Sequence, residues 1–126
     1  GSPEELQQVA ADCRVLVAAA GPYQLIGEGA VRACVEAATH YVDVTGEIVW
    51  VQEMIQKYHQ RAQAKGVMII HCAAQVCAVD ELNCYLLARE LGPLRQFREY
   101  FFMYGGMTGG TVSTNLATAA GPTPGE

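Results

Sequence analysis

The chain has 126 residues, of which 51% are hydrophobic and 17% are charged, and its 8 basic and 13 acidic residues give a net charge of −5. This length suits one domain, and the composition excludes a disordered or collagen-like chain. An acidic chain without a basic cluster lacks the electrostatic footprint of a nucleic-acid partner. No apolar run approaches the roughly 18 residues of a membrane-spanning helix, so we predict no transmembrane segment.

The two ends of the chain and its cysteines add three expectations. Gly1-Ser2-Pro3 is typical of an expression remnant, so we expect residues 1–12 to hold this remnant and the end of an incoming helix. Five cysteines at irregular spacings, with no C-x-x-C pair, disfavour a disulfide framework and a zinc site. We therefore expect no metal and an intracellular, reducing location. Residues 121–126, rich in Gly and Pro, predict a flexible tail.

The first part of the chain alternates strand and helix. Residues 14–20 form a short apolar run closed by a Gly-Pro pair, which predicts a strand buried on both faces. Apolar residues recur at three- and four-residue steps over 27–38 and predict a helix. Residues 41–45 are β-branched and aromatic and stop at Gly46, which predicts a second strand.

The same rhythm continues to Pro93. Helical spacing over 48–64, an apolar run over 67–72 and a second helical pattern over 78–91 predict helix, strand and helix. Because β-α-β units form right-handed crossovers, the three strands must lie in one parallel sheet with helices against its faces. The sequence therefore predicts an α/β fold, half of a doubly wound parallel sheet.

The pattern changes after Pro93. Residues 97–104 are aromatic and partly alternating, which predicts a strand that leaves the first layer. A run of glycines over 105–110 ends this pattern, and residues 111–120 predict the beginning of a helix.

Ligands of an open parallel sheet bind beyond the carboxyl ends of its strands. The segments at these places are Gly21-Pro22-Tyr23, Thr45-Gly46-Glu47 and 73–75. Gly and Pro let a backbone approach a flat ligand closely, and Tyr23 could stack on that ligand or donate a hydrogen bond. The alternative interpretation is a plain turn between strand and helix.

The remaining motifs do not identify a phosphate-binding loop or a catalytic group. Neither residues 27–29 nor residues 105–110 match a G-x-G-x-x-G fingerprint or a P-loop. The carboxylates of Asp43, Glu47 and Glu53 give no acid–base pair that spacing alone can identify. His71 and Cys72 are neighbours in a predicted strand and so point to opposite faces, which disfavours a paired thiol nucleophile. We assign no catalytic residue.

Four segments in order, 15–23, 27–34, 41–47 and 58–66, resemble the saccharopine dehydrogenase-like oxidoreductases, and the resemblance covers about residues 13–113. It implies that residues 13–93 are the C-terminal part of a dinucleotide-binding Rossmann domain, with three strands alternating with helices. Residues 94–120 would then begin a second, catalytic or dimerisation domain. The phosphate-binding loop and the first three strands, the N-terminal half of the sheet, would precede residue 1.

The resemblance also implies a cofactor, NAD or NADP, whose nicotinamide side the loops after the first two strands would line. The implied cofactor-binding residues are Gly21, Pro22, Tyr23, Thr45, Gly46 and Glu47. Without the glycine-rich turn that holds the pyrophosphate, we expect no tight cofactor binding by this chain alone.

Residues 74–82 depart from the resemblance. Relatives carry a Gly-Phe-Asp-Ser-x-Pro-x-Asp-Leu-Gly segment there, and only Asp80 and Leu82 match it. The departure implies an altered pocket near the hydride-accepting carbon of the cofactor.

Three functions are therefore open. The leading interpretation is a fragment of a nicotinamide-dependent oxidoreductase, inactive alone, whose partner is the missing N-terminal half of its own domain. A half-sheet also leaves an exposed edge, so we expect self-association. The alternative is a catalytically silent module for binding or assembly. A third possibility, a thiol-dependent enzyme, would use Cys72 or Cys77.

Overall fold

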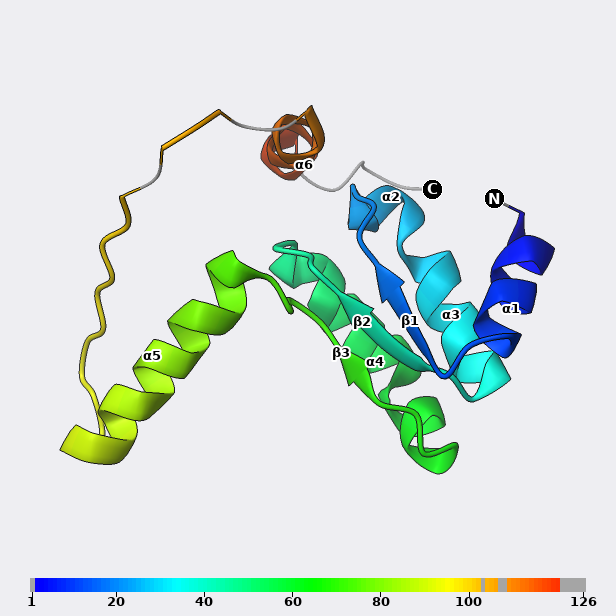
Figure 1. Cartoon of the computed structure of the whole chain (residues 1–126), viewed down its shortest axis with the longest axis horizontal. Helices are drawn as coiled ribbons and strands as arrows, with labels where there is room; N and C mark the ends of the chain where they lie inside the picture. The colour runs from blue at the N-terminus through cyan, green and yellow to red at the C-terminus, as the bar shows by residue number, and fades with distance from the viewer. Residues whose placement is uncertain (1, 103, 107–108, 121–126) are drawn as a thin grey trace.

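The computed structural model describes residues 2–102, 104–106 and 109–120 (Figure 1). Along the chain its elements are α1 Pro3–Ala11, β1 Val15–Ala18, α2 Tyr23–Ile26, α3 Glu28–Ala37, β2 His40–Asp43, α4 Ile48–Ala64, β3 Ile69–Ile70, α5 Gln75–Leu91 and α6 Gly109–Ala120. Within these described ranges, no helix is long and apolar enough to cross a membrane.

The three strands form one parallel sheet in the order β1-β2-β3. Val15 lies beside His40 in the first pair of strands, and Val42 lies beside Ile70 in the second pair. Strands alternate with helices along the chain, as expected for parallel neighbours joined by crossovers. The predicted α/β class and the single parallel sheet are confirmed.

One face of the sheet carries the core. Helices α3 and α4 lie on this face, and α1 packs against α3 (Figure 1). Val31, Cys34 and Val35 of α3 are fully buried, which confirms the apolar face that their spacing predicted. Tyr41 of β2 and Met54 of α4 are also buried in this layer. Burying each large apolar side chain stabilises the fold by about 1.5–3 kcal/mol.

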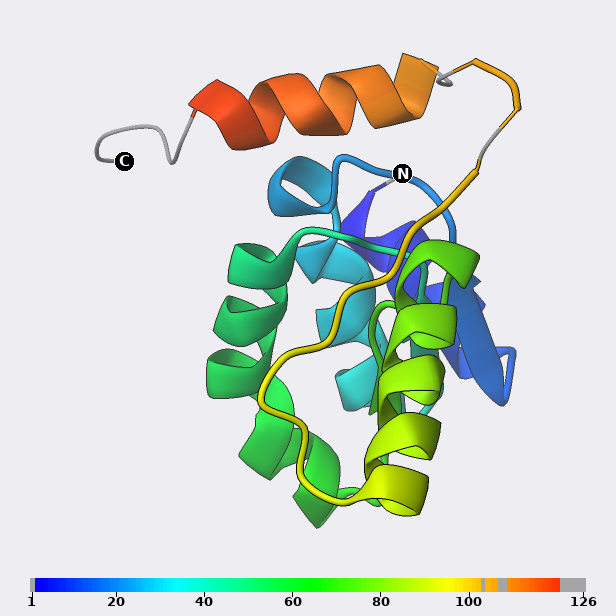
Figure 2. The ribbon, with the colours of Figure 1, turned by 90° about the vertical axis from the view of Figure 1, so that its left-hand side faces the viewer.

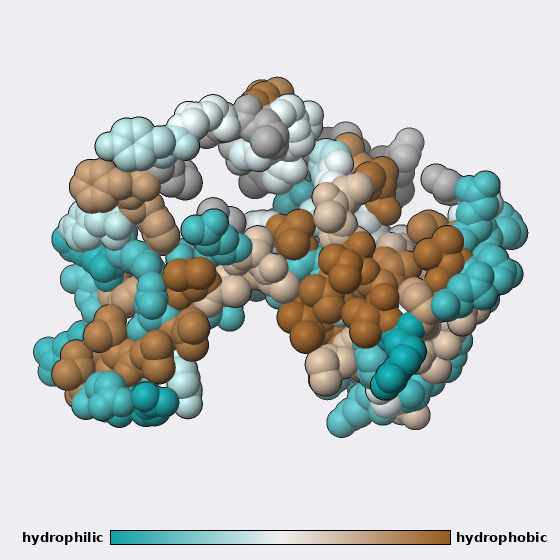
Figure 3. Space-filling model, in the orientation of Figure 1, coloured by the Kyte–Doolittle hydropathy of each residue, from teal (hydrophilic) through white to brown (hydrophobic). Residues whose placement is uncertain are grey.

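The opposite face of the sheet is uncovered. Val15, Val17 and Ile70 are 46%, 65% and 43% exposed, and apolar side chains gather on this side of the molecule (Figure 3). Burial of the first strand on both faces is therefore a wrong prediction for the described chain. The reason is the course of α5, which leaves the end of β3 and diverges from the sheet (Figure 1).

Helix α1 starts with a complete capping box. The amide of Glu5 donates to Ser2 Oγ at 3.2 Å, and the amide of Ser2 donates to Glu5 Oε2 at 2.8 Å. These two bonds satisfy amides that the first turn of a helix leaves without partners. The helix predicted within residues 1–12 thus begins at Pro3.

The strand over 67–72 is shorter than predicted, although the chain still runs along β2 on both sides of it. The amide of Tyr41 donates to the Met68 carbonyl at 2.9 Å, and the amide of Ala73 donates to the Asp43 carbonyl at 2.8 Å. These two bonds hold the ends of the segment, and α5 then begins at Gln75 rather than at residue 78.

The strand predicted over 97–104 is a wrong prediction, because residues 97–102 and 104, which the structure describes, form no strand. A strand needs a neighbour to satisfy its backbone groups. No described strand runs beside this segment, and Tyr100, Phe102 and Tyr104 are exposed. The predicted tail, 121–126, lies outside the described residues.

Candidate functional site

A buried carboxylate ties the loop after β1 to the loop after β2. Glu47 Oε1 accepts a hydrogen bond from the amide of Tyr23 at 2.9 Å, and Glu47 Oε2 accepts one from the amide of Gln24 at 2.7 Å. Only 8% of Glu47 is exposed. Both carboxylate oxygens therefore serve as acceptors for the first amides of α2, which no carbonyl within that helix can satisfy. We call this arrangement the Glu47 clamp.

Tyr23 is built into the same loop. Its hydroxyl donates to the Ala18 carbonyl at 2.8 Å, and its ring lies 5.4 Å from the Trp50 ring, measured between centroids. Burial raises the pKa of this hydroxyl. Since 5% of Tyr23 is exposed, its side chain faces the core and shapes the loop from within.

Thr45 shapes the second loop in the same way. Its amide donates to Asp43 Oδ1 at 3.1 Å, and its hydroxyl accepts from the amide of Glu47 at 3.0 Å. Thr45 is 1% exposed. These two bonds turn the chain at the end of β2 and place Glu47 where it can form its clamp.

The other three predicted residues form the surface of the two loops. Gly21 and Gly46 are exposed and Pro22 is partly exposed. A side chain added at Gly46 would meet no atom within 4 Å, and one added at Gly21 would lie 3.6 Å from Thr114 Oγ1 of α6. Helix α6 lies across this end of the molecule (Figure 2). The loops thus offer open, largely backbone surface beside α6.

This surface fits one part of a dinucleotide. Bare backbone at Gly21 and Gly46 allows a flat ring to approach closely, as a nicotinamide would require. The loops carry no glycine-rich turn that opens a helix of the kind that holds a pyrophosphate. The chain therefore has residues suited to the nicotinamide side and none of the fingerprint for the phosphates.

The sequence did not reveal a buried pair of side chains, Asp43 and His71, beside these loops. His71 Nδ1 lies 2.6 Å from Asp43 Oδ2, and their side chains are 9% and 0% exposed. The amide of Cys72 donates to Asp43 Oδ1 at 3.0 Å. Both residues stand near the ends of neighbouring strands, and this was the available signal for their proximity.

The pKa of Asp43 reflects opposing effects. Burial alone would raise it, because a charged carboxylate is poorly solvated inside the protein. The hydrogen bonds from His71 and from the amides of Cys72 and Thr45 outweigh burial and lower the pKa below its ordinary value. Asp43 is therefore held as a carboxylate that orients the imidazole ring of His71.

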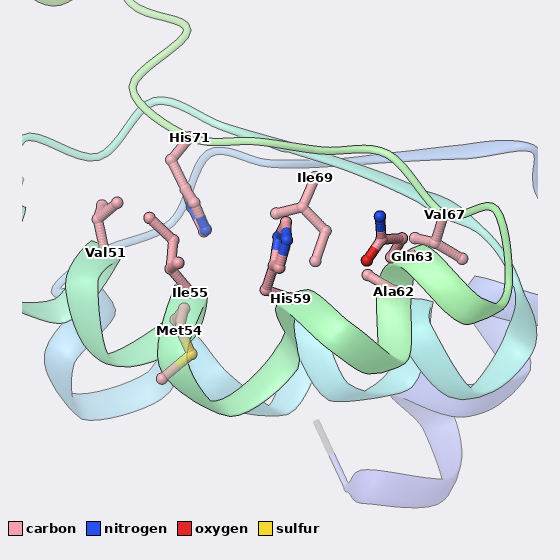
Figure 4. A pocket seen from close by; sticks show the side chains of 9 residues that line it. All are labelled: Val51, Met54, Ile55, His59, Ala62, Gln63, Val67, Ile69 and His71. Atoms are coloured by element: carbon pink, nitrogen blue, oxygen red, sulfur yellow. The ribbon is translucent and has the colours of Figure 1, made fainter.

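His71 also lines a cavity of about 500 Å³ between α4 and β3. Figure 4 shows its ring directed from the chain after β3 toward α4. The other lining residues are mostly apolar: Val51, Met54, Ile55, His59, Ala62, Gln63, Val67 and Ile69. None of the six predicted cofactor-binding residues lines this cavity, so the cavity and the loops are separate features.

The thiol chemistry considered for Cys72 finds no support in its surroundings. Burial, followed by the nearby Cys77 thiol, raises the pKa of Cys72 to about 11. Burial also raises the pKa of Cys34 to about 11. A thiol with such a pKa is almost wholly protonated at neutral pH and a poor nucleophile. The Nδ1 atom of the neighbouring residue, His71, is paired with Asp43.

Residues 75–82 form the start of α5, and Ala74 is its N-cap. Cys77 Sγ of this segment donates to the Thr45 carbonyl at 3.9 Å. Leu82 is 54% exposed. Across residues 2–102, 104–106 and 109–120, no group of three metal-ligating side chains comes together.

Comparisons with known proteins connect this geometry to a family. The model of the saccharopine dehydrogenase NADP binding domain matches residues 1–70. A putative trans-acting enoyl reductase of Mycobacterium tuberculosis is 34% identical over 126 residues, which covers 90% of this chain and 29% of that protein. A lipid droplet localized protein of Caenorhabditis elegans is 30% identical over 122 residues, covering 92% of this chain and 29% of that protein.

A third relative carries the family name. A saccharopine dehydrogenase-like oxidoreductase of Bos taurus is 38% identical over 69 residues, which is 55% of this chain and 16% of that protein. The chain thus spans less than a third of the length of each of these relatives. No solved structure matches it. Since the family model covers more than half of the chain and the relatives agree with it, the chain belongs to the saccharopine dehydrogenase NADP-binding domain family.

Proposed function

We propose that this chain contributes the nicotinamide-side loops of a dinucleotide site in a larger nicotinamide-dependent oxidoreductase, and that it has no activity alone. The Glu47 clamp carries the proposal. By binding two amides of the other loop, Glu47 fixes the distance between Gly21 and Gly46. A rigid pair of bare backbone surfaces is what close contact with a flat ring requires.

The cofactor proposed here is NADP or NAD, which would supply the hydride for reduction when bound. The match to an NADP-binding family model and the names of the oxidoreductase relatives support it. In this proposal Gly21, Pro22 and Gly46 contact the ligand, while Tyr23, Thr45 and Glu47 position the loops that carry them. The phosphates would be held by sequence that precedes residue 1, so the chain alone binds the cofactor weakly.

The Glu47 clamp can be tested by Glu47→Gln in a longer form of the protein that carries a complete domain. The new amide group would face a backbone N–H, so one of two hydrogen bonds is lost and the loops loosen. We expect NADPH affinity, measured by calorimetry, to fall about tenfold, which corresponds to about 1.4 kcal/mol. Glu53→Gln, an exposed change on α4, is the matched control and should leave affinity unchanged. Equal affinity in both variants would refute the role of the clamp.

A second candidate function is a silent module for binding or assembly, favoured by the uncovered sheet face. Val15, Val17 and Ile70 remain exposed, and Leu82 and Leu86 of α5 are 54% and 37% exposed. Exposed apolar surface on a sheet and on a neighbouring helix is typical of contact sites. We infer that this face is covered by the rest of the domain in the longer protein and drives self-association in the chain alone.

We also propose an intracellular, reducing location. The odd number and irregular spacing of the five cysteines, which do not suit a disulfide framework, support it.

A further inference from the structure

The connection between β3 and α5 brings two cysteines together. Cys72 precedes the connection, Cys77 lies in the first turn of α5, and both are partly buried. Two successive tight turns fold the intervening chain. The amide of Ala74 donates to the Cys72 carbonyl at 2.8 Å, and the amide of Cys77 donates to the Ala74 carbonyl at 3.0 Å. These turns fold the four residues between the two cysteines and bring the start of α5 back toward Cys72.

Each thiol is also held from outside the connection. The Cys72 amide is bound to Asp43 Oδ1 at 3.0 Å, and Cys77 Sγ donates to the Thr45 carbonyl at 3.9 Å. Both contacts reach the end of β2, so this strand anchors both cysteines. Asp43 Oδ1 also accepts the amide of Thr45 at 3.1 Å, so both cysteines are held against one short turn, Asp43 to Thr45. After burial, the nearby Cys77 thiol is the strongest influence that raises the pKa of Cys72.

The third cysteine of this region is too far away to compete. Cys84 lies seven residues beyond Cys77 on the same helix, a rise of about 10.5 Å at 1.5 Å per residue. The α-carbons of a disulfide lie only about 4.4–6.8 Å apart. While α5 stays helical, Cys77 can reach Cys72 but not Cys84.

We propose that Cys72 and Cys77 form a reversible disulfide bond, a modification site that controls how α5 leaves the sheet. This inference does not depend on the proposed cofactor site. The bond would tie the first turn of α5 to the end of β3, beside Thr45. Both cysteines are partly exposed, so a bond between them stays within reach of glutathione and can be reduced again.

The oxidant in this proposal is a low-molecular-weight disulfide such as oxidised glutathione. The thiolate of Cys77 attacks one glutathione sulfur, the glutathione S–S bond breaks, and one glutathione leaves and takes a proton. Cys72, whose thiol is mostly protonated at neutral pH, loses its proton to solvent and attacks the Cys77 sulfur within the same chain. This step forms the Cys72–Cys77 bond and releases the second glutathione, which takes up a proton. Two electrons pass from the two cysteines to the glutathione disulfide, and two thiols of glutathione are produced.

The test uses the whole 126-residue chain equilibrated in glutathione redox buffers, then quenched with acid and alkylated. Cleavage after Lys65 and Arg89 gives one peptide with Cys72, Cys77 and Cys84, and fragmentation in a mass spectrometer locates the bond. We expect the Cys72–Cys77 bond to exceed the Cys77–Cys84 bond at least about tenfold in the native chain. In concentrated guanidinium chloride the two should agree within about threefold, because the two loops differ little in closure entropy.

Three serine variants complete the experiment. Cys72→Ser and Cys77→Ser should each abolish the intramolecular bond, whereas the matched control Cys84→Ser should form it as the natural chain does. Circular dichroism checks that each variant is folded. The proposal is overturned if the folded natural chain accumulates glutathione adducts without forming the bond, or if Cys77 pairs with Cys84 as readily as with Cys72.

Discussion

Two buried carboxylates accept hydrogen bonds from the segments at the carboxyl end of the sheet. Glu47 accepts hydrogen bonds from two amides of the loop after β1. Asp43 accepts hydrogen bonds from the amides of Cys72 and Thr45 and is paired with the ring of His71. A carboxylate with several donors is stabilised in its charged form even when it is buried. These two side chains therefore fix three consecutive segments of chain in place.

The pH dependence of stability should report on Asp43. Its pKa in the folded protein lies below the unfolded value of about 3.9, so its charge stabilises the fold above that pH. This contribution is lost as the pH falls through the lower, folded pKa. We expect Asp43→Asn to be less stable at pH 7, and its deficit relative to the natural chain to shrink as the pH falls below about 4.

Urea unfolding at several pH values measures this difference. Loss of a hydrogen bond to a buried charged group costs about 1.5–3 kcal/mol, and the amide retained in Asn should keep the loss near the lower end. A deficit that stays constant from pH 7 to pH 3 would show that the charge of Asp43 does not stabilise the fold.

At this scale the sequence identified positions better than roles. Strand ends located Gly21 and Gly46 correctly as exposed loop positions. The hydrogen bonds that Glu47 accepts could not be predicted, because their donors lie 24 and 23 positions earlier in the chain. The same holds for Asp43 and His71, which are 28 positions apart.

At the scale of elements, the entry into α3 depends on close packing at Gly27. A side chain added there would lie 2.7 Å from Trp50 Cζ2 and 2.8 Å from the Tyr23 carbonyl. These contacts are far shorter than van der Waals separation, and one of them is to the backbone. Gly27 is therefore required for the approach of α2 to α4.

We expect Gly27→Ala to lower the free energy of unfolding by about 1–3 kcal/mol, the usual cost of overpacking. Gly46→Ala is the control, because its new side chain meets nothing within 4 Å, and its stability should change by less than about 0.5 kcal/mol. Chemical unfolding of both variants measures the difference. Similar stabilities would show that α2 can shift away from α4 without cost.

The order of the elements was predictable, and their limits less so. Apolar runs and helical spacing indicated all three strands, α3, α4 and most of α5. The short helix α2 has four residues and no amphipathic repeat, so spacing carried no signal for it. The aromatic segment after Pro93 has residues that are common in strands. A strand forms only beside another strand that pairs with its backbone, and composition does not show whether such a neighbour is present.

At the scale of the whole molecule, the uncovered sheet face should govern association. We expect the chain to self-associate in a concentration-dependent way, and Val17→Lys to raise the dissociation constant at least about tenfold, because a buried lysine is costly. Gln52→Lys adds the same charge at an exposed position of α4 and is the control. Sedimentation analysis distinguishes them. A natural chain that stays monomeric at high concentration would contradict this expectation.

The proposed cofactor site is best tested by a calorimetric titration of NADPH into this chain and into a longer form of the protein that includes sequence before residue 1. We predict binding by the longer form and none, or very weak binding, by the chain alone, because the loops after β1 and β2 lack an anchor for the phosphates. Absence of binding by both forms would contradict the proposed cofactor site and favour a silent assembly module.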